Sequence, residues 1–297
     1  MSMKFTPAIR KRAKLRLAIS GPSGSGKTYG ALQIAAGIGG KVALIDTERG
    51  SASLYSDMLQ FDTLELNPPY SPERFIDAIK AAEAAGYDVL VIDSITHEWN
   101  GSGGCCDINE NLAQAKYRGN TWSAWSETAP RHRAFVDAIL QSGCHVIATM
   151  RSKTETVQGE DKKVRKVGMK TEQRDGTDYE FTVMLELEHE KHLAVATKDR
   201  TRLFREPHVI TPETGRRLIA WLDSGAVPRI SETEIADHVA AIEGAADLDT
   251  LKTAFGTAWT AAKKIKDEDA EAKFKAAYDK RKAELTAPVA VAQEDAA

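Results

Sequence analysis

A short glycine-rich segment restricts the folds open to this chain more than any other part of its sequence. Residues 21–28 read GPSGSGKT and lie between an apolar run and a helical stretch, the setting that the pattern G-x-x-x-x-G-K-[ST] requires. Glycines let backbone N–H groups turn inward around phosphate oxygens, and a helix N-terminus adds a positive dipole end. The segment therefore predicts a phosphate-binding loop for a nucleoside triphosphate, expected to be ATP, in which Lys27 reaches the β- and γ-phosphates and Thr28 binds Mg²⁺. Its eight residues are Gly21, Pro22, Ser23, Gly24, Ser25, Gly26, Lys27 and Thr28.

Two carboxylates follow apolar runs further along the chain. Asp93 ends YDVLVID, where it is expected to hold the Mg²⁺ ion through water. Glu48 lies just past a second predicted strand, in LIDTE, on the sheet edge that would carry the phosphate loop. A carboxylate there can orient a water molecule toward the γ-phosphate. Spacing alone leaves open the alternative that Glu48 is a solvated loop residue paired with Arg49.

The segment 14–228 alternates apolar β-type runs with helical stretches, which predicts an α/β fold with a mainly parallel central sheet. Residues 96–128 have little periodicity and many Gly, Asn and Ser residues, so we expect much of this segment to be loop. A polar stretch rich in both charges follows at 152–178. The predicted strands are 15–20, 41–46, 89–93, 145–150, 180–188 and 193–198, and the predicted helices are 29–38, 72–85 and 130–141.

The composition changes after Pro228, where an alanine- and lysine-rich region begins. Ser231 and Glu234 have the spacing of a capping box, and apolar residues then recur at helical intervals. We expect a basic N-terminal arm at 1–13, the α/β core at 14–228, a small three-helix domain at 229–287 and a disordered tail at 288–297.

The composition argues against several classes of protein and site. The formal net charge is -3, so any nucleic-acid surface must be local. Three cysteines, two of them adjacent, form neither a disulfide framework nor a zinc-ligand spacing, and the seven histidines offer no metal pattern. We find no signal region or membrane-spanning run, so we expect a cytoplasmic protein, in a host cytoplasm if it is encoded by a phage, with no membrane partner.

The succession GPSGSGKT, ALIDTE and DVLVIDS resembles the RecA core, over roughly residues 14–205. MRSKTE at 150–155 and KVGMKTEQRDGTDYEFTV at 166–183 are similar to segments of compact RecA-like recombinases and annealing proteins of bacteriophages. The resemblance implies that Glu48 is catalytic, that Tyr55 stacks on adenine, and that ATP lies between protomers of a homo-oligomer. It also implies that Lys198 and Arg200 reach the ATP of a neighbouring subunit, whereas without it they are a surface basic pair. RecA has a γ-phosphate-sensing glutamine after the strand at 145–150, and this chain has Arg151 nearby instead.

Two stretches match the loops that RecA-like proteins turn toward single-stranded DNA. The first, at about 97–128, contains Arg118, Trp122 and Trp125. Aromatic rings can stack on bases and arginine can hold phosphate, although the tryptophans could instead pack under the loop. The second, 152–178, concentrates its positive charge in one block that is either a DNA contact or a solvated face. Its candidate DNA-binding residues are Lys162, Lys163, Arg165 and Lys166.

These patterns lead to one hypothesis with two rivals. The hypothesis is an ATP-dependent, single-stranded-DNA-binding recombinase or annealing protein of RecA type, which uses ATP and Mg²⁺. The rivals are a helicase or branch-migration motor on the same core, and a nucleotide-switched loading module that hydrolyses little ATP. The C-terminal helices could bind a single-strand-binding protein or cap the core. The sequence leaves open ring or filament, DNA polarity and base preference.

Overall fold

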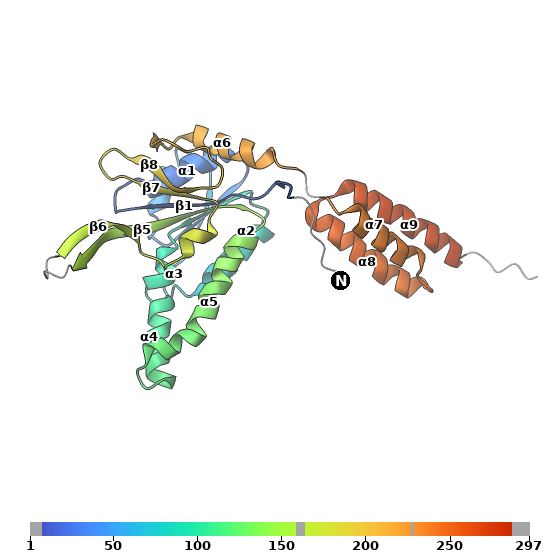
Figure 1. Ribbon diagram of the computed structural model, residues 1–297, viewed down its shortest axis with the longest axis horizontal. Helices are drawn as coiled ribbons and strands as arrows, with labels where there is room; N and C mark the ends of the chain where they lie inside the picture. The colour runs from blue at the N-terminus through green and yellow to red at the C-terminus, as the bar shows by residue number, and fades with distance from the viewer. Residues whose placement is uncertain (1–7, 159–163, 227–228, 287–297) are drawn as a thin grey trace, which may run out of the picture. The chain divides into compact units, whose positions relative to one another are not determined.

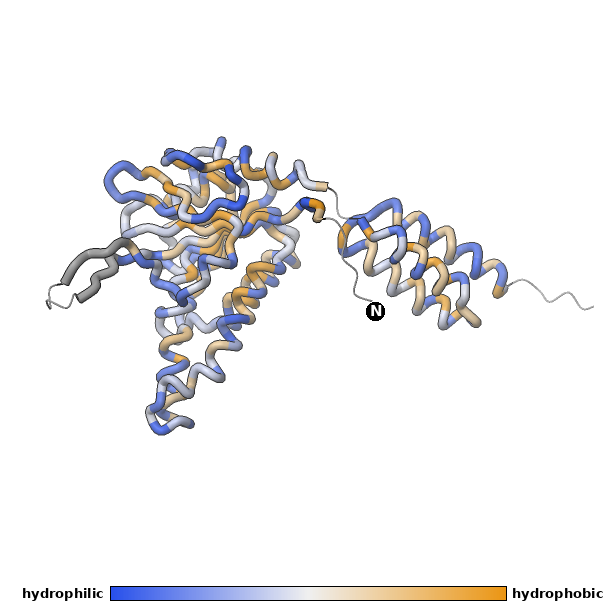
Figure 2. Tube along the Cα trace, viewed as in Figure 1, coloured by the Kyte–Doolittle hydropathy of each residue, from blue (hydrophilic) through white to orange (hydrophobic). Residues whose placement is uncertain are grey.

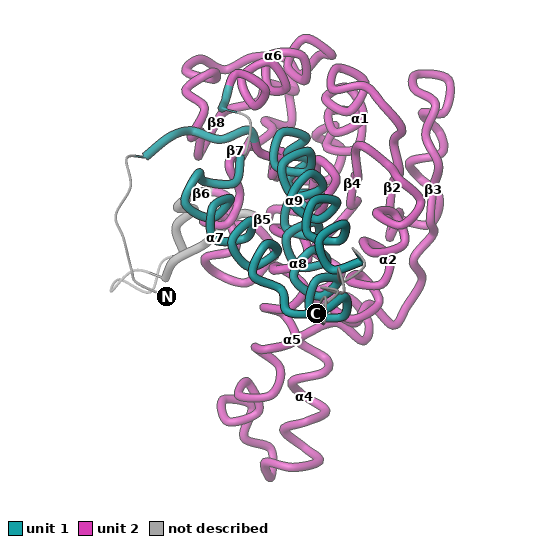
Figure 3. The backbone as a smooth tube through the Cα atoms, turned by 90° about the vertical axis from the view of Figure 1, so that its right-hand side faces the viewer, with its two compact units in different colours: residues 1–12, 225–297 teal, residues 13–224 magenta. Residues whose placement is uncertain are grey.

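The computed structural model describes residues 8–158, 164–226 and 229–286. The chain divides into two compact units, one of residues 13–224 and one that combines residues up to 12 with those from 225 onward (Figure 3). The predicted tail at 288–297, the first seven residues of the predicted arm, and Lys162 and Lys163 lie outside the described residues.

The larger unit is built on a mixed, mostly parallel sheet (Figure 1). In the described residues the order is β3-β2-β4-β5-β1-β7-β8-β9, with β6 paired to the extended end of β5. Neighbours from β3 to β7 pair in parallel, whereas β8, β9 and β6 are antiparallel to their partners. This confirms the predicted α/β class. The strands are β1 (Arg16–Gly21), β2 (Val42–Asp46), β3 (Asp62–Glu65), β4 (Val89–Asp93), β5 (His145–Gln158), β6 (Val164–Thr171), β7 (Val183–Leu187), β8 (Leu193–Asp199) and β9 (His208–Val209).

Every residue of the central strands β1 and β4 is buried, rather than every second one, which shows that helices cover both faces of the sheet. In β1, Leu17 and Ile19 pack on the side of helices α1 (Lys27–Ile38) and α6 (Pro212–Asp223). Ala18 packs on the opposite side, with α2 (Pro72–Ala84) and α5 (Thr121–Gln141). Figure 2 shows the resulting apolar centre along these strands. Continuous apolar strands of this kind are typical of parallel sheets between helical layers.

The expectation of a loop over 96–128 is wrong. Most of this segment is helical, in α3 (Thr96–Asn100), α4 (Cys105–Lys116) and the first part of α5, and α4 and α5 extend beyond the sheet as a pair (Figure 1). The buried positions of α4 recur every four residues, but they are Cys105, Asn109 and Ala113. Because Asn109 is polar and Ala113 is small, the hydropathy of the sequence does not show this helical period. The sequence predicts a helix that begins at Pro130, but Pro130 lies inside α5.

Further elements were not predicted from the sequence, among them the two-residue strand β9. The polar stretch after residue 152 continues β5 and turns back as β6, so its first part is a two-stranded hairpin rather than loop. Strand β3 was missed because all four of its residues are exposed, which leaves no apolar period. Helix α6 is also absent from the predicted elements.

The smaller unit has three helices in its described part, α7 (Glu232–Glu243), α8 (Leu248–Ile265) and α9 (Glu268–Thr286), around a core that includes Leu251 and Phe274. The capping box is present, since the Ser231 hydroxyl accepts from Glu234 N and the Glu234 carboxylate accepts from Ser231 N. The backbone N–H of Arg12 donates to the carbonyl of Ala226 at 2.8 Å, within the same unit. No helix of the described residues has the length and hydropathy needed to cross a membrane.

Candidate nucleotide site and its neighbouring cavity

The phosphate loop connects β1 to the first turn of α1. Gly24 and Gly26 have φ angles of 77° and 91°, which favour glycine, and Lys27 is the first residue of the helix. The Ser25 hydroxyl is buried and has no hydrogen-bond partner among the described residues. A buried orphan donor inside a glycine turn matches what a bound phosphate oxygen would satisfy. The loop therefore fits the triphosphate that its sequence predicts.

Lys27 lies at the mouth of this loop. Its ammonium donates to the carbonyl of Pro22 at 2.8 Å. Burial lowers the pKa of Lys27, while the nearby carboxylates of Asp93 and Glu48 act in the opposite direction. A cation placed between a phosphate loop and two carboxylates is in position to neutralise phosphate charge.

Thr28 and Asp93, the two predicted magnesium ligands, meet in the structure. The Thr28 hydroxyl donates to Oδ2 of Asp93 at 2.5 Å, and the Thr149 hydroxyl donates to Oδ1. Burial raises the pKa of Asp93, and the two hydroxyl hydrogen bonds act against that shift. A buried carboxylate is stabilised in its charged form by a divalent cation, and hydroxyl and carboxylate oxygens are ligands that Mg²⁺ prefers. The pair therefore fits the predicted ion.

Glu48 faces the same cavity as the phosphate loop, where it pairs with Arg151 of β5. The Arg151 guanidinium donates to Oε1 of Glu48 at 2.8 and 3.1 Å. The partner that the structure provides is thus Arg151 rather than Arg49. Asp46 fixes the turn that carries Glu48, because its carboxylate accepts from the backbone N–H groups of Glu48 and Ala52.

Two adjoining cavities meet at the phosphate loop. The first, of about 430 Å³, is lined by Lys27, Thr28, Glu48 and Arg151. The second, of about 470 Å³, is lined by apolar residues that include Leu187, Val209 and Ile210, and by His192. Tyr29 and Tyr55 border both, with their ring centroids 5.9 Å apart in an edge-to-face arrangement. A polar cavity beside an aromatic and aliphatic one suits a phosphate tail and a nucleoside. The contact of Tyr55 with a base stays a prediction.

Comparison with known proteins agrees with this geometry. A family model described as the AAA domain matches residues 13–218, more than half of the chain. The chain belongs to the AAA domain family. It is therefore a P-loop NTPase, and its AAA domain coincides with the unit that holds the phosphate loop. No curated protein matches the chain.

Lys198 and Arg200 lie at a different place on the AAA domain. The described residues that line the two phosphate-loop cavities do not include either of them. The Lys198 ammonium donates to the carbonyls of Asp178, at 3.0 Å, and Tyr179, and Arg200 donates to Tyr179 at 3.4 Å. Both therefore contact the short helical turn η2 (Thr177–Glu180). Their action on the ATP of a neighbouring subunit stays a prediction.

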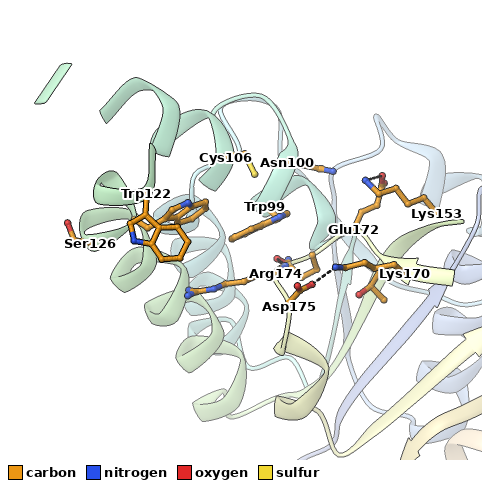
Figure 4. A pocket seen from close by; sticks show the side chains of 13 residues that line it. Trp99, Asn100, Cys106, Trp122, Ser126, Lys153, Lys170, Glu172, Arg174 and Asp175 are labelled. Carbon is orange, nitrogen blue, oxygen red and sulfur yellow. Dashed lines mark hydrogen bonds and ion pairs between the residues drawn. The ribbon is translucent and has the colours of Figure 1, made fainter. Parts of the chain in front are cut away.

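A third and larger cavity of the AAA domain, of about 1010 Å³, lies between α3–α5 and the β5–β6 strands (Figure 4). Trp99 and Trp125 stack with ring centroids 5.2 Å apart, whereas Trp122 is 87% exposed. The strand side contributes Lys153 and Lys170, each paired with an acidic neighbour, as well as Arg174. Of the two tryptophans considered from the sequence, Trp125 packs against another ring and Trp122 is exposed to solvent.

Arg118, another predicted DNA-binding residue, lies outside this lining. Arg118 is exposed beyond the end of α4, with a φ of 52°. Arg165 and Lys166 belong to β6, where their backbones are in register with Val157 and Thr156 of β5.

Arg151 connects the nucleotide cavity to the tryptophan cavity. While its side chain pairs with Glu48, its backbone carbonyl accepts from Glu172 N at 2.7 Å, and its N–H donates to Thr96 Oγ1 at 2.9 Å. Glu172 and Gln173 line the tryptophan cavity. Gln173 and Thr149 are not predicted from the sequence, because they act through contacts with residues far away in the chain, Gln173 with the Ile95 carbonyl and Thr149 with Asp93.

Proposed function

We propose that this AAA domain protein is a single-stranded-DNA-dependent ATPase of RecA type, which promotes annealing or strand exchange. ATP and Mg²⁺ would bind at the phosphate loop, between neighbouring protomers of a homo-oligomer. The observation that carries the proposal is Arg151, whose side chain reaches Glu48 in the nucleotide cavity and whose backbone pairs with a wall of the tryptophan cavity.

The nucleotide chemistry follows from the loop and its carboxylates. The inward N–H groups and Lys27 would hold the phosphates, while Thr28 and Asp93 would hold Mg²⁺, which neutralises charge that develops on the β- and γ-phosphates. Glu48 has the role of orienting the attacking water and accepting its proton. That role requires the carboxylate to be released from its ion pair with Arg151.

The DNA interface would be the tryptophan cavity. Stacked and exposed indole rings beside lysine and arginine form the combination that holds single strands without reading their sequence. Trp122 is the clearest base platform, because its ring is exposed and has no core to support. Binding through such a surface is sensitive to salt, since phosphate contacts release counterions.

Coupling between the two ligands would pass through Arg151. DNA that contacts residues 172–174 shifts a segment whose backbone is bonded to Arg151, and this alters the grip of Arg151 on Glu48. Arg151 would thereby take the place of the γ-phosphate-sensing glutamine of RecA. Each ligand must then favour the same arrangement of Arg151 and its neighbours on β5.

The test is phosphate release from ATP with and without single-stranded DNA, in Mg²⁺. We expect DNA to raise turnover, and we expect complementary strands to pair faster with ATP than without it. An unchanged rate of turnover, together with an unchanged assembly state, would refute the proposal. Duplex unwinding with a fixed polarity would instead indicate a motor.

One observation favours a second candidate, a nucleotide-switched loading module. In the structure, the Glu48 carboxylate is held in an ion pair by Arg151. If ATP binding leaves that pair intact, the protein would bind DNA in an ATP-dependent way and hydrolyse little. DNA binding that depends on ATP, with negligible phosphate release at saturating DNA, would support this second candidate.

A further inference from the structure

A cluster of three metal-ligating side chains lies outside the nucleotide site. Glu98 of α3, Cys105 of α4 and His132 of α5 place a carboxylate oxygen, a thiol sulfur and a ring nitrogen within 4.8 Å of one another. The described part of the chain contains no other group of this kind. Their positions in the sequence, seven and 34 residues from Glu98, match no familiar ligand spacing, so only the fold brings them together.

All three side chains are withdrawn from solvent. Glu98 and Cys105 have no exposed surface, and His132 is 3% exposed. Cys105 Sγ donates to Oε1 of Glu98 at 3.1 Å, and Nδ1 of His132 lies 3.1 Å from both carboxylate oxygens. Ligands that share one zinc ion at about 2.0–2.3 Å lie roughly 3–4 Å from one another. The distances from Glu98 to Cys105 and to His132 therefore match the spacing that a metal ion imposes, and the third pair lies within 4.8 Å.

We propose that Glu98, Cys105 and His132 bind one zinc ion, which fastens α3, α4 and α5 together at the base of the helical pair. Zinc is the metal of choice because the set combines thiolate, imidazole and carboxylate. A carboxylate, a thiolate and a neutral imidazole around Zn²⁺ sum to zero charge, which removes the cost of a buried carboxylate. Binding releases the Cys105 thiol proton to solvent, and a water molecule completes four ligands.

The ion would also set the geometry of the neighbouring aromatic residues. The Trp99 ring packs edge-on against His132 at 5.3 Å and stacks on Trp125. An imidazole fixed by a metal cannot rotate, so its ring holds Trp99 in one orientation. The zinc site would therefore stiffen one wall of the tryptophan cavity, but its existence does not depend on the function proposed for that cavity.

Zinc titration of the metal-free full-length protein tests this inference, with a chromogenic chelator as competitor. We expect one zinc ion per chain and a higher Tm, and Co²⁺ in place of zinc should give a thiolate-to-cobalt absorption band. Cys105→Ser and His132→Gln should weaken zinc binding by more than the roughly 10–100-fold typical of outer-shell partners. Cys106→Ser and Cys144→Ser are the matched controls and should bind zinc like the wild type, since neither thiol belongs to the cluster.

Two results would overturn the inference. One is a wild-type protein that takes up no stoichiometric zinc and gives no thiolate band with Co²⁺, a measurement that needs no variant to fold. The other is wild-type zinc affinity in Cys105→Ser. Neither depends on ATP or DNA, so failure here is distinct from failure of the proposed function.

Discussion

Replacing Glu48 with Gln removes a carboxylate while keeping the shape of the side chain. Its ion pair with Arg151 spans 2.8 Å, and the two side chains are 27% and 43% exposed. Solvent screens a pair this open, so its contribution is about 0–1 kcal/mol. We therefore expect Glu48→Gln to lower the free energy of unfolding by less than about 1 kcal/mol, measured by urea denaturation.

The effect on hydrolysis should be far larger. A positioned general base contributes about 10²–10⁴-fold to the rate, which corresponds to roughly 3–5 kcal/mol of activation free energy. Phosphate release should fall by that factor with and without DNA, while calorimetry should still detect ATP binding. This variant keeps Lys27, Thr28 and Asp93, so the residues expected to bind the phosphates and Mg²⁺ are unchanged.

Arg151→Gln is the matched control because it breaks the same ion pair but keeps the Glu48 carboxylate. Both variants should lose similar stability, and Arg151→Gln should lose the stimulation by DNA. If Glu48→Gln hydrolyses ATP at the wild-type rate, Glu48 is not the base. If Arg151→Gln is still fully stimulated by DNA, the coupling route is wrong.

Three further predictions concern other parts of the chain. Trp122→Ala should leave stability nearly unchanged, because the ring is 87% exposed, yet weaken single-stranded DNA binding by about 1–3 kcal/mol in a fluorescence anisotropy titration; an unchanged Kd would remove Trp122 from the interface. His145 accepts a hydrogen bond from Leu15 N, and burial lowers the pKa of His145 to about 4, so the unfolded chain binds more protons between pH 4 and about 6.5. This stabilisation is complete above about pH 6.5 and is lost as the pH falls to 4. The free energy of unfolding, measured with urea, should therefore decrease by about 2–3 kcal/mol over this range, and His145→Asn should reduce that decrease. Equal pH profiles for the wild type and the variant would contradict this prediction. Lys198→Ala and Lys27→Ala proteins, each impaired alone, should regain phosphate release when mixed if Lys198 acts across a subunit interface, and no gain on mixing would place Lys198 outside the site.

The nucleotide site was accessible from the sequence because its chemistry is local. Residues 21–28 form one turn, and their glycine, lysine and hydroxyl pattern has few other physical uses. Asp93 was found from the end of an apolar run, and parallel pairing of β2 with β4 brings such strand ends to one edge. The buried strands were found for the same reason, since apolar runs mark them directly.

What the sequence did not reveal depends on contacts between distant segments. Asn109, Thr128 and His132 are buried polar residues on helices α4 and α5, so the apolar period that would mark these helices is broken. The cluster at Glu98 is invisible for a related reason, because its three ligands come from three helices. Arg151 was noted only as a substitute for a glutamine, and its partner Glu48 lies 103 residues away.

Calorimetric titration of ATP into the wild-type protein and Lys27→Ala, with and without Mg²⁺, tests the nucleotide site most directly. We expect one ATP per chain in the wild type, markedly weaker binding when Mg²⁺ is removed, and the largest loss in Lys27→Ala, because its ammonium stands at the mouth of the loop. A folded wild-type protein that takes up no ATP in the presence of Mg²⁺ and DNA, or a Lys27→Ala variant that binds ATP as the wild type does, would contradict the account.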